Sequence, residues 1–403
     1  MQHEVRVLLV QFVTAVAAFI VFLTLQGQAQ TEKIIYSFSG GADGADPMGG
    51  LIVDANGNLY GVTPGGGTNY GGTVFELTPS TGGTWSKSLL YSFNPKQGDV
   101  SYPDSNLVFD AKGNLYGICF TGGGANGAGG IFELSPGSNG TWNEKVIYSF
   151  VGGVDSIYIG SPLTIDGAGN LYGYHNAVYG SIFELQPGSN GTWTEKTLHT
   201  FSGGNDGTIQ YGDQLSVDAS GNLYGQARVG PHDFGIVFEL VRGPTGSWTE
   251  KILYTFTGGV DGSAGVGSRI LRDANSNLFG VSSWNVFELM PGSNGSWTEK
   301  VLHTFTGGSD GAYPESGLTI DASGKLYGAT YEGGGAHRGT VFELTPAANG
   351  SWTEKILHRF TRTGGDGAYP SFLTLAIDEQ GNLYGTTLSG GTSNFGVVFE
   401  VTP

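Results

Sequence analysis

The chain repeats one short phrase seven times, and this repetition restricts its fold more than any other feature. The phrase first appears as DANGNLYG at residues 54–61, and the other copies begin at Asp110, Asp166, Asp218, Asp273, Asp321 and Asp378. Successive copies begin 48 to 57 residues apart. A period of this length is typical of arrays in which each unit buries its apolar faces against its neighbours.

Each repeat contains four short runs with the character of β-strands. In the unit at 318–360 these runs are LTID, LYGAT, TVFELT and WTEKILHRF, here named strands A to D. Tight Asp/Gly or Asn/Gly turns and Gly-rich loops separate them, which argues against helices. Seven units of four strands predict an all-β, seven-bladed β-propeller. A solenoid is the alternative architecture.

The two ends of the chain complete one another. The segment TEKIIYSF at 31–38 matches strand D, yet it precedes the first strand A, while the seventh unit stops after strand C at 396–403. We therefore expect the N-terminal strand to complete the last blade and close the ring, leaving no unpaired blade edge. A solenoid would not explain this arrangement. The propeller domain is predicted to span 30–403.

Residues 1–29 have the pattern of an export signal. The segment 5–25 is almost wholly apolar, and Gly-Gln-Ala at 27–29 provides the small residues that signal peptidase requires. A retained N-terminal anchor is the alternative, because about 20 apolar residues can also span a bilayer. The sequence predicts a bacterial protein that is secreted, periplasmic or on the cell surface, with no other membrane segment.

The charge and cysteine content exclude some classes of protein. The net charge of −17 argues against nucleic-acid binding, which needs a basic surface. Cys119 is the only cysteine, so the domain contains no disulfide. We expect a monomer that requires no cofactor.

The repeat unit, DxxGNLYGxT followed by GxVFELTP and GxWxEKxLYxF, resembles the GloVer tandem repeat of bacterial exported proteins. The resemblance covers nearly all of 31–403. It implies a surface or secreted repeat protein of uncharacterised activity and provides no catalytic residues to transfer. Such proteins often carry an anchor after the repeats; because this sequence stops at Pro403, we expect none here.

Strand order places the B–C and D–A loops together on one face of the propeller, which we call the loop face. Each D–A loop carries one aspartate in a GGxDG-like sequence: Asp43, Asp99, Asp155, Asp206, Asp261, Asp310 and Asp366. A ring of carboxylates suits Ca²⁺ or a polar glycan, because hard cations prefer oxygen ligands. The alternative is that these aspartates only shape turns.

The variable B–C loops contain three histidines, His175, His232 and His337, which make a candidate metal or ligand site together with Arg228 and Arg338. By contrast, His199, His303 and His358 replace a strand-D tyrosine and are interpreted as structural substitutions. Blade five is the least regular: its B–C loop is very short, and Arg272 stands where other innermost strands carry apolar residues. We predict that Arg272 lines the central channel or pairs with a neighbouring blade.

These observations favour a binding or scaffolding module with a glycan or protein ligand on the loop face. The alternatives are a propeller-type hydrolase, lyase or cyclase with a metal or carboxylates at the channel mouth, and a passive structural repeat. Near-equivalence of the blades argues against catalysis, which usually singles out one place. Fold alone does not decide between these classes.

Overall fold

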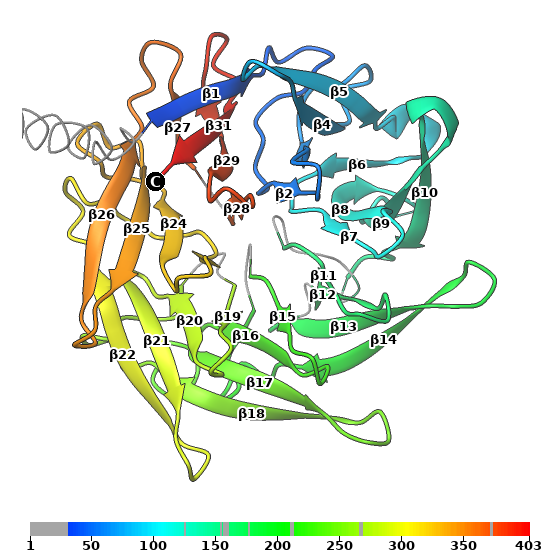
Figure 1. Ribbon diagram of the computed structural model, residues 1–403. Coiled ribbons are helices and arrows are strands. Elements are labelled where there is room, and N and C mark those ends of the chain that lie inside the picture. The colour runs from blue at the N-terminus through cyan, green and yellow to red at the C-terminus, as the bar shows by residue number, and fades with distance from the viewer. Residues whose placement is uncertain are drawn as a thin grey trace, which may run out of the picture.

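The structure, a computed structural model, describes residues 31–124, 126–153, 155, 161–175, 178–209, 213–265, 269–370 and 374–403. It confirms an all-β propeller of seven antiparallel blades arranged around a central axis (Figure 1). The predicted signal peptide at 1–29 lies outside these residues. Within them, no helix combines the length and apolar character needed to cross a bilayer.

Blades one to four follow the predicted order, with a two-residue strand innermost and an eight-residue strand outermost (Figure 1). Their strands are β2 (Ile52–Val53), β3 (Leu59–Thr63), β4 (Thr73–Pro79) and β5 (Trp85–Ser92); β7 (Val108–Phe109), β8 (Leu115–Gly122), β9 (Gly130–Pro136) and β10 (Trp142–Ser149); β11 (Thr164–Ile165), β12 (Leu171–His175), β13 (Ser181–Pro187) and β14 (Trp193–Thr200); and β15 (Ser216–Val217), β16 (Leu223–Ala227), β17 (Ile236–Arg242) and β18 (Trp248–Thr255).

Blades five to seven repeat this arrangement. Their strands are β19 (Leu271–Arg272), β20 (Leu278–Val281), β21 (Asn285–Pro291) and β22 (Trp297–Thr304); β23 (Thr319–Ile320), β24 (Leu326–Thr330), β25 (Thr340–Pro346) and β26 (Trp352–Arg359); and β28 (Ala376–Ile377), β29 (Leu383–Thr387), β31 (Val397–Thr402) and β1 (Thr31–Ser37). The remaining elements are β6 (Val100–Pro103), β27 (Gly367–Ala368), β30 (Ser389–Gly390) and the 3₁₀ turns η1 (Pro95–Gln97) and η2 (Ser138–Gly140).

The N-terminal strand closes the ring as expected. Strand β1 pairs antiparallel with β31, and Ile34 lies opposite Phe399 in this register. Figure 1 shows β1 as the outer strand of the blade that also holds the C-terminus. The two ends of the chain therefore share one sheet. The chain enters this blade from blade six through β28 and leaves it towards blade one through β1.

The repeated aspartate shapes the A–B turn. In the first copy, Asp54 Oδ1 accepts the backbone N–H groups of Asn56 and Asn58 at 2.8 and 2.9 Å, and Oδ2 accepts the Tyr60 hydroxyl at 3.2 Å. These bonds satisfy the turn locally, as Asx turns do. The structure thus assigns this aspartate to the turn.

The core lies between blades. The phenylalanine that ends each strand D packs edge-on against the phenylalanine of the next strand C, as in Phe38–Phe75 at 5.3 Å and Phe360–Phe399 at 5.1 Å between ring centroids. The glycine of each LYG leaves room for that ring: a Cβ on Gly61 would lie 2.7 Å from Phe75 Cζ. Blades are therefore held together by contacts that a single blade could not make.

Every strand D contains a register shift relative to its strand C. In β14 the shift separates Thr197, opposite Phe183, from His199, opposite Ile182. A β-bulge of this kind re-aims the side chains that follow it. In this propeller, the residue after the bulge is the strand-D tyrosine or histidine.

Candidate functional site: a cavity on the loop face

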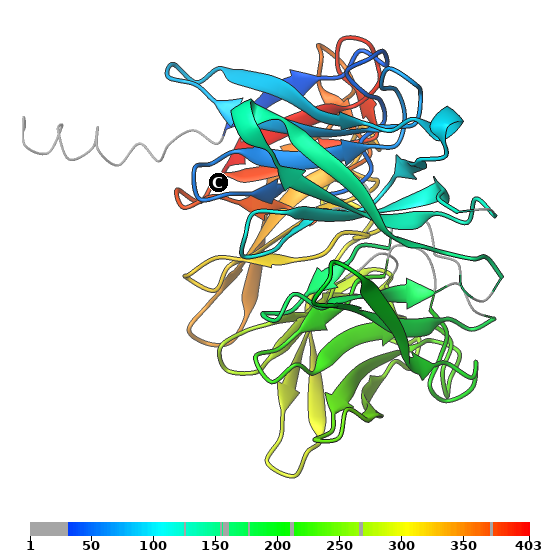
Figure 2. The same cartoon turned by 90° about the vertical axis from the view of Figure 1, so that its right-hand side faces the viewer.

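The D–A and B–C loops lie side by side at one end of the blades, as predicted. Isolated bridges join them, including Thr208 with Arg228 and Ala264 with Ser282. Figure 2 shows the ring from the side, with the two sets of connections at opposite ends of the blades. The loop face is therefore one connected surface.

Blade five creates a hollow in this surface. Its B–C connection contains only residues 282–284, whereas those of blades four and six span 228–235 and 331–339. Two hydrogen bonds hold this short turn against the preceding D–A loop. Ser282 Oγ donates to Asp261 O and Asn285 Nδ2 donates to Val260 O, each at 3.0 Å. The B–C loop of blade four and the D–A loops on either side of blade five surround this turn and form a cavity of about 450 Å³.

Aromatic rings border this cavity. Phe234 and Tyr313 line it, and the Trp284 ring packs against Tyr313 at an interplanar angle of 41°, with ring centroids 4.8 Å apart. About 40% of the surface of each ring-bearing residue is exposed. Tyr313 has a positive φ of 54°, which is uncommon for a bulky residue. Asp46, Tyr102 and Tyr369 share a positive φ at the corresponding position of other D–A loops, so this conformation belongs to the repeat.

The polar groups of the cavity carry both signs of charge. Arg228, Asp233 and Glu315 line it together with serine residues. Burial raises the pKa of Glu315, and the nearby Arg228 opposes this effect. A pocket with apolar walls and a few convergent polar groups is the usual form of a small-ligand site.

The structure separates the predicted histidine cluster. His175 is buried: its Nε2 lies 3.4 Å from Asp155 Oδ1 and its ring stacks on Phe183 at 4.7 Å. His232 and His337 are exposed on the loops of blades four and six. The two close groups of metal-ligating side chains found among the described residues include none of the three.

The predicted arginines are also dispersed. Arg228 belongs to the cavity, whereas Arg338 covers the Tyr369 ring, with its guanidinium carbon 5.0 Å from the ring centroid. Arg272 is exposed and donates to Ser276 Oγ at 2.7 Å within its own A–B turn. Arg272 thus lies at the end of blade five that faces away from the loop face.

The predicted aspartates lie where each D–A loop begins. Each accepts backbone N–H groups of its own loop, as Asp261 does from Thr257 at 2.8 Å, and most accept a strand-D side chain, as Asp261 does from Tyr254 at 3.0 Å. Burial opposes ionisation of Asp261, but these hydrogen bonds outweigh it and lower its pKa. Turn formation therefore explains most of the seven aspartates, which lie just after the outer strands of the blades.

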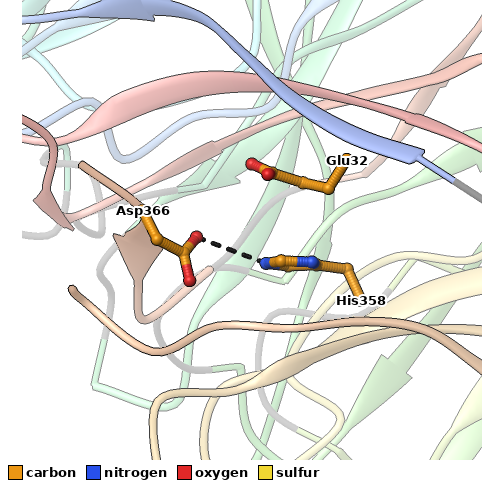
Figure 3. Close-up of side chains that lie close together, drawn as sticks. All are labelled: Glu32, His358 and Asp366. Carbon is orange, nitrogen blue, oxygen red and sulfur yellow. Dashed lines mark hydrogen bonds and ion pairs between the residues drawn. The ribbon is translucent and has the colours of Figure 1, made fainter. Parts of the chain in front are cut away.

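Two of these aspartates belong to tighter clusters that the sequence reasoning missed. His199, Asp206 and Glu250 offer ligand atoms within 4.8 Å of one another, and so do His358, Asp366 and Glu32. Figure 3 shows Glu32, from β1, converging on the His358–Asp366 pair of blade six. The sequence did contain a signal for these clusters. Histidine replaces tyrosine at one position of strand D, and the D–A loop that follows carries an aspartate.

The family can be stated from the repeat itself. The Gloeobacter/Verrucomicrobia repeat matches residues 19–178 and 285–403, which is more than half of the chain. The chain belongs to this family. Most of the cavity lining, from Arg228 to Ser283, falls between the two matched ranges of the Gloeobacter/Verrucomicrobia repeat. No curated protein sequence matches the chain.

Solved structures with a similar fold include an inactive variant of virginiamycin B lyase from Staphylococcus aureus, determined with quinupristin. It is 13% identical, with 93% of this chain and 99% of that chain covered and a TM-score of 0.57. The extracellular domain of a putative hybrid two-component system from B. thetaiotaomicron is also 13% identical, with 93% of this chain and 41% of that chain covered and a TM-score of 0.55. Sequence identities this low show that the Gloeobacter/Verrucomicrobia repeat protein shares the fold of both structures, and no more than the fold.

Proposed function

We propose that this protein is an exported binding module that recognises neutral glycans in the cavity of blades four to six. The observation that carries the proposal is the pair of rings Phe234 and Tyr313, the latter packed against Trp284, in a cavity that also presents Arg228 and Glu315. Aromatic rings stack on the apolar faces of sugars, while charged and hydroxyl groups meet sugar hydroxyls. The net charge of −17 favours neutral over acidic glycans.

The distribution of exposed aromatic residues supports this choice of face. In the described part of the chain, the large exposed aromatic residues lie in B–C or D–A loops or at the loop-face end of β8: Tyr70, Tyr102, Phe120, Tyr179, Phe234, Trp284, Tyr313 and Phe395. Fold stability does not require exposed rings at one end of the ring only. A ligand that contacts the loop face explains the asymmetry.

Export is part of the proposal. It rests on the apolar segment 5–25 followed by small residues at 27–29. The extracellular domain that shares the fold is consistent with it.

Binding can be tested with the purified protein and soluble neutral polysaccharides, such as xylan and β-glucan, with pectin as the acidic comparison. We expect retardation by a neutral polysaccharide in affinity electrophoresis. Tyr313→Ala should weaken binding about tenfold or more, because an anchoring aromatic ring in the cavity contributes roughly 1–2 kcal/mol or more. The control is Leu89→Ala, which removes an exposed apolar side chain from the outer strand β5 of blade one, away from the loop face. Equal weakening by both variants, or no retardation of the wild type, would contradict the proposal.

The second candidate is a glycan-cleaving enzyme, and Glu315 is the observation that favours it. Its pKa is raised by burial inside the cavity, as a general acid requires. Mass spectrometry of the bound polysaccharide after incubation would reveal shortened products. Their loss in Glu315→Gln, with binding retained, would establish the enzyme; unchanged glycan would establish a binding module.

A further inference from the structure

The outer rim of the ring contains a recurrent cluster between neighbouring blades. Each cluster joins the strand-D tyrosine or histidine of one blade, the aspartate of its D–A loop, and a third residue, which lies two places after the strand-D tryptophan position of the next blade. At six interfaces that third residue is a glutamate: Glu32, Glu144, Glu195, Glu250, Glu299 and Glu354. Two carboxyl groups from different blades are thus placed together repeatedly.

Most of these glutamates have one carboxylate oxygen that is buried without a hydrogen-bond partner. One buried Oε1 atom accepts no hydrogen bond in five of them: Glu32, Glu144, Glu250, Glu299 and Glu354. Burial and the neighbouring Asp206 raise the pKa of Glu250 to about 7. A buried carboxylate beside a second carboxylate needs a cation or a proton.

The seventh interface supplies its own cation. Lys87 occupies the glutamate position there, and its Nζ donates to Asp43 O at 2.8 Å. The same ammonium lies 5.4 Å from the centroid of the Tyr36 ring. The chain thus shows that this position accommodates a positive charge between blades.

Histidine adds a nitrogen ligand at particular interfaces. His199 Nε2 is buried, accepts no hydrogen bond and lies 3.8 Å from Asp206 Oδ2. Burial lowers the pKa of His199 against the opposing effect of Asp206, which favours the neutral imidazole that binds metals. At the second interface, His358 Nε2 lies 3.2 Å from Asp366 Oδ1, and the Glu32 carboxylate faces both (Figure 3).

We propose that His199, Asp206 and Glu250 bind one divalent transition-metal ion, Zn²⁺ in the first place, and that His358, Asp366 and Glu32 bind another. One imidazole with two carboxylates suits Zn²⁺, whereas Ca²⁺ prefers oxygen ligands alone. Three ligands at about 2.0–2.2 Å from Zn²⁺ stand roughly 3.4 Å apart. The donor atoms lie within 4.8 Å of one another, so small side-chain rotations complete each site.

The second site has a structural consequence. Glu32 lies on β1, the strand that closes the ring, whereas His358 and Asp366 belong to blade six and its following loop. A metal ion there ties the closing strand to the neighbouring blade. The ion would therefore stabilise the circular arrangement itself, independently of the glycan cavity.

The third histidine interface provides a matched control. His303 Nε2 lies 3.9 Å from Asp310 Oδ2, but the described residues do not form a close three-ligand group there. Burial and the charge of Asp310 raise the pKa of Glu354 here, and the guanidinium of Arg359 opposes this effect, so a cation already lies near this interface. Tyrosine occupies the same position in four blades, which makes a histidine-to-tyrosine change compatible with the fold.

The test is metal content by mass spectrometry after EDTA treatment, addition of Zn²⁺ and dialysis. We expect two ions per chain in the wild type and in His303→Tyr, one in His199→Tyr or His358→Tyr, and none in the double variant. Bound Zn²⁺ should raise the melting temperature of the wild type, while EDTA should not destabilise the double variant. Zero bound Zn²⁺ in the wild type, or an unchanged count in the double variant, would overturn the proposal. If a tyrosine variant fails to fold, Glu250→Gln and Glu32→Gln each remove one ligand and should each remove one ion.

Discussion

Glu144 should make the stability of the propeller depend on pH. It lies between blades one and two beside Asp99, and Tyr91 occupies the position that a histidine takes at other interfaces. One oxygen of each carboxyl group is buried without a hydrogen bond. Burial, with the charge of Asp99, raises the pKa of Glu144 from 4.5 to about 7.

The sign and size of the effect follow from this shift. Between pH 4.5 and about pH 7, the folded chain holds a proton that the unfolded chain releases. The free energy of unfolding therefore falls as the pH rises through this range. The full shift corresponds to roughly 3 kcal/mol. Solvent at the rim screens it, so we expect about 1–2 kcal/mol.

The variant Glu144→Gln removes the titration and keeps the shape. At pH 8 it should unfold with a free energy about 1–2 kcal/mol higher than that of the wild type, because no charge is buried and its amide can donate to Asp99. At pH 5 the two proteins should differ by less than about 0.5 kcal/mol, as for most neutral substitutions.

Urea unfolding followed by tryptophan fluorescence at both pH values measures this difference. Glu379→Gln, at an exposed position in the A–B turn of blade seven, is the control and should show no pH-dependent gain. A gain for Glu144→Gln that is equal at both pH values, or a loss at pH 8, would refute the reasoning. The glutamate would then not be protonated in the folded state.

Three further predictions concern single positions. Phe38→Ala should lower the free energy of unfolding by about 3–5 kcal/mol in urea, because the ring is fully buried against Phe75 where the N-terminal strand closes the propeller; a loss below about 1 kcal/mol would contradict this. Gly311→Ala should destabilise the protein by about 1–3 kcal/mol in the same assay, because φ is +114° and the new Cβ would lie 2.4 Å from Thr330 Oγ1. Cys119 is fully buried, and burial raises its pKa well above the ordinary value, so a thiol reagent should label it only after unfolding. Rapid labelling of the native protein would show that blade two opens locally.

Much of the architecture could be predicted because it is encoded by residues close together in the chain. The Asp54 turn needs only Asn56, Asn58 and Tyr60, and it recurs with each copy of the phrase. The position of TEKIIYSF ahead of its own repeat indicated the closure that β1 and β31 make. The family resemblance is likewise confirmed by the match of the Gloeobacter/Verrucomicrobia repeat.

The site was harder to predict because its members come from different blades. His175, His232 and His337 were all assigned to B–C loops, yet His175 is the last residue of β12 and is buried on Phe183, whereas the other two are exposed in loops. The strand-D histidines were interpreted as structural substitutions. The β-bulge, however, directs His199 towards Asp206, and Glu250 arrives from the next blade. Loop length in one repeat also says little about a cavity until the neighbouring loops are in place.

The sequence alone determined the number of blades, the strand order, the turns and the closing strand, because periodic apolar residues and local hydrogen bonds act over a few residues. Only the tertiary structure decided which side chains meet. The cavity over blade five and the clusters at Asp206 and Asp366 form where separate repeats come together in the closed ring. A repeat specifies its own strands, whereas the chemistry between blades depends on the register and curvature that the whole ring imposes.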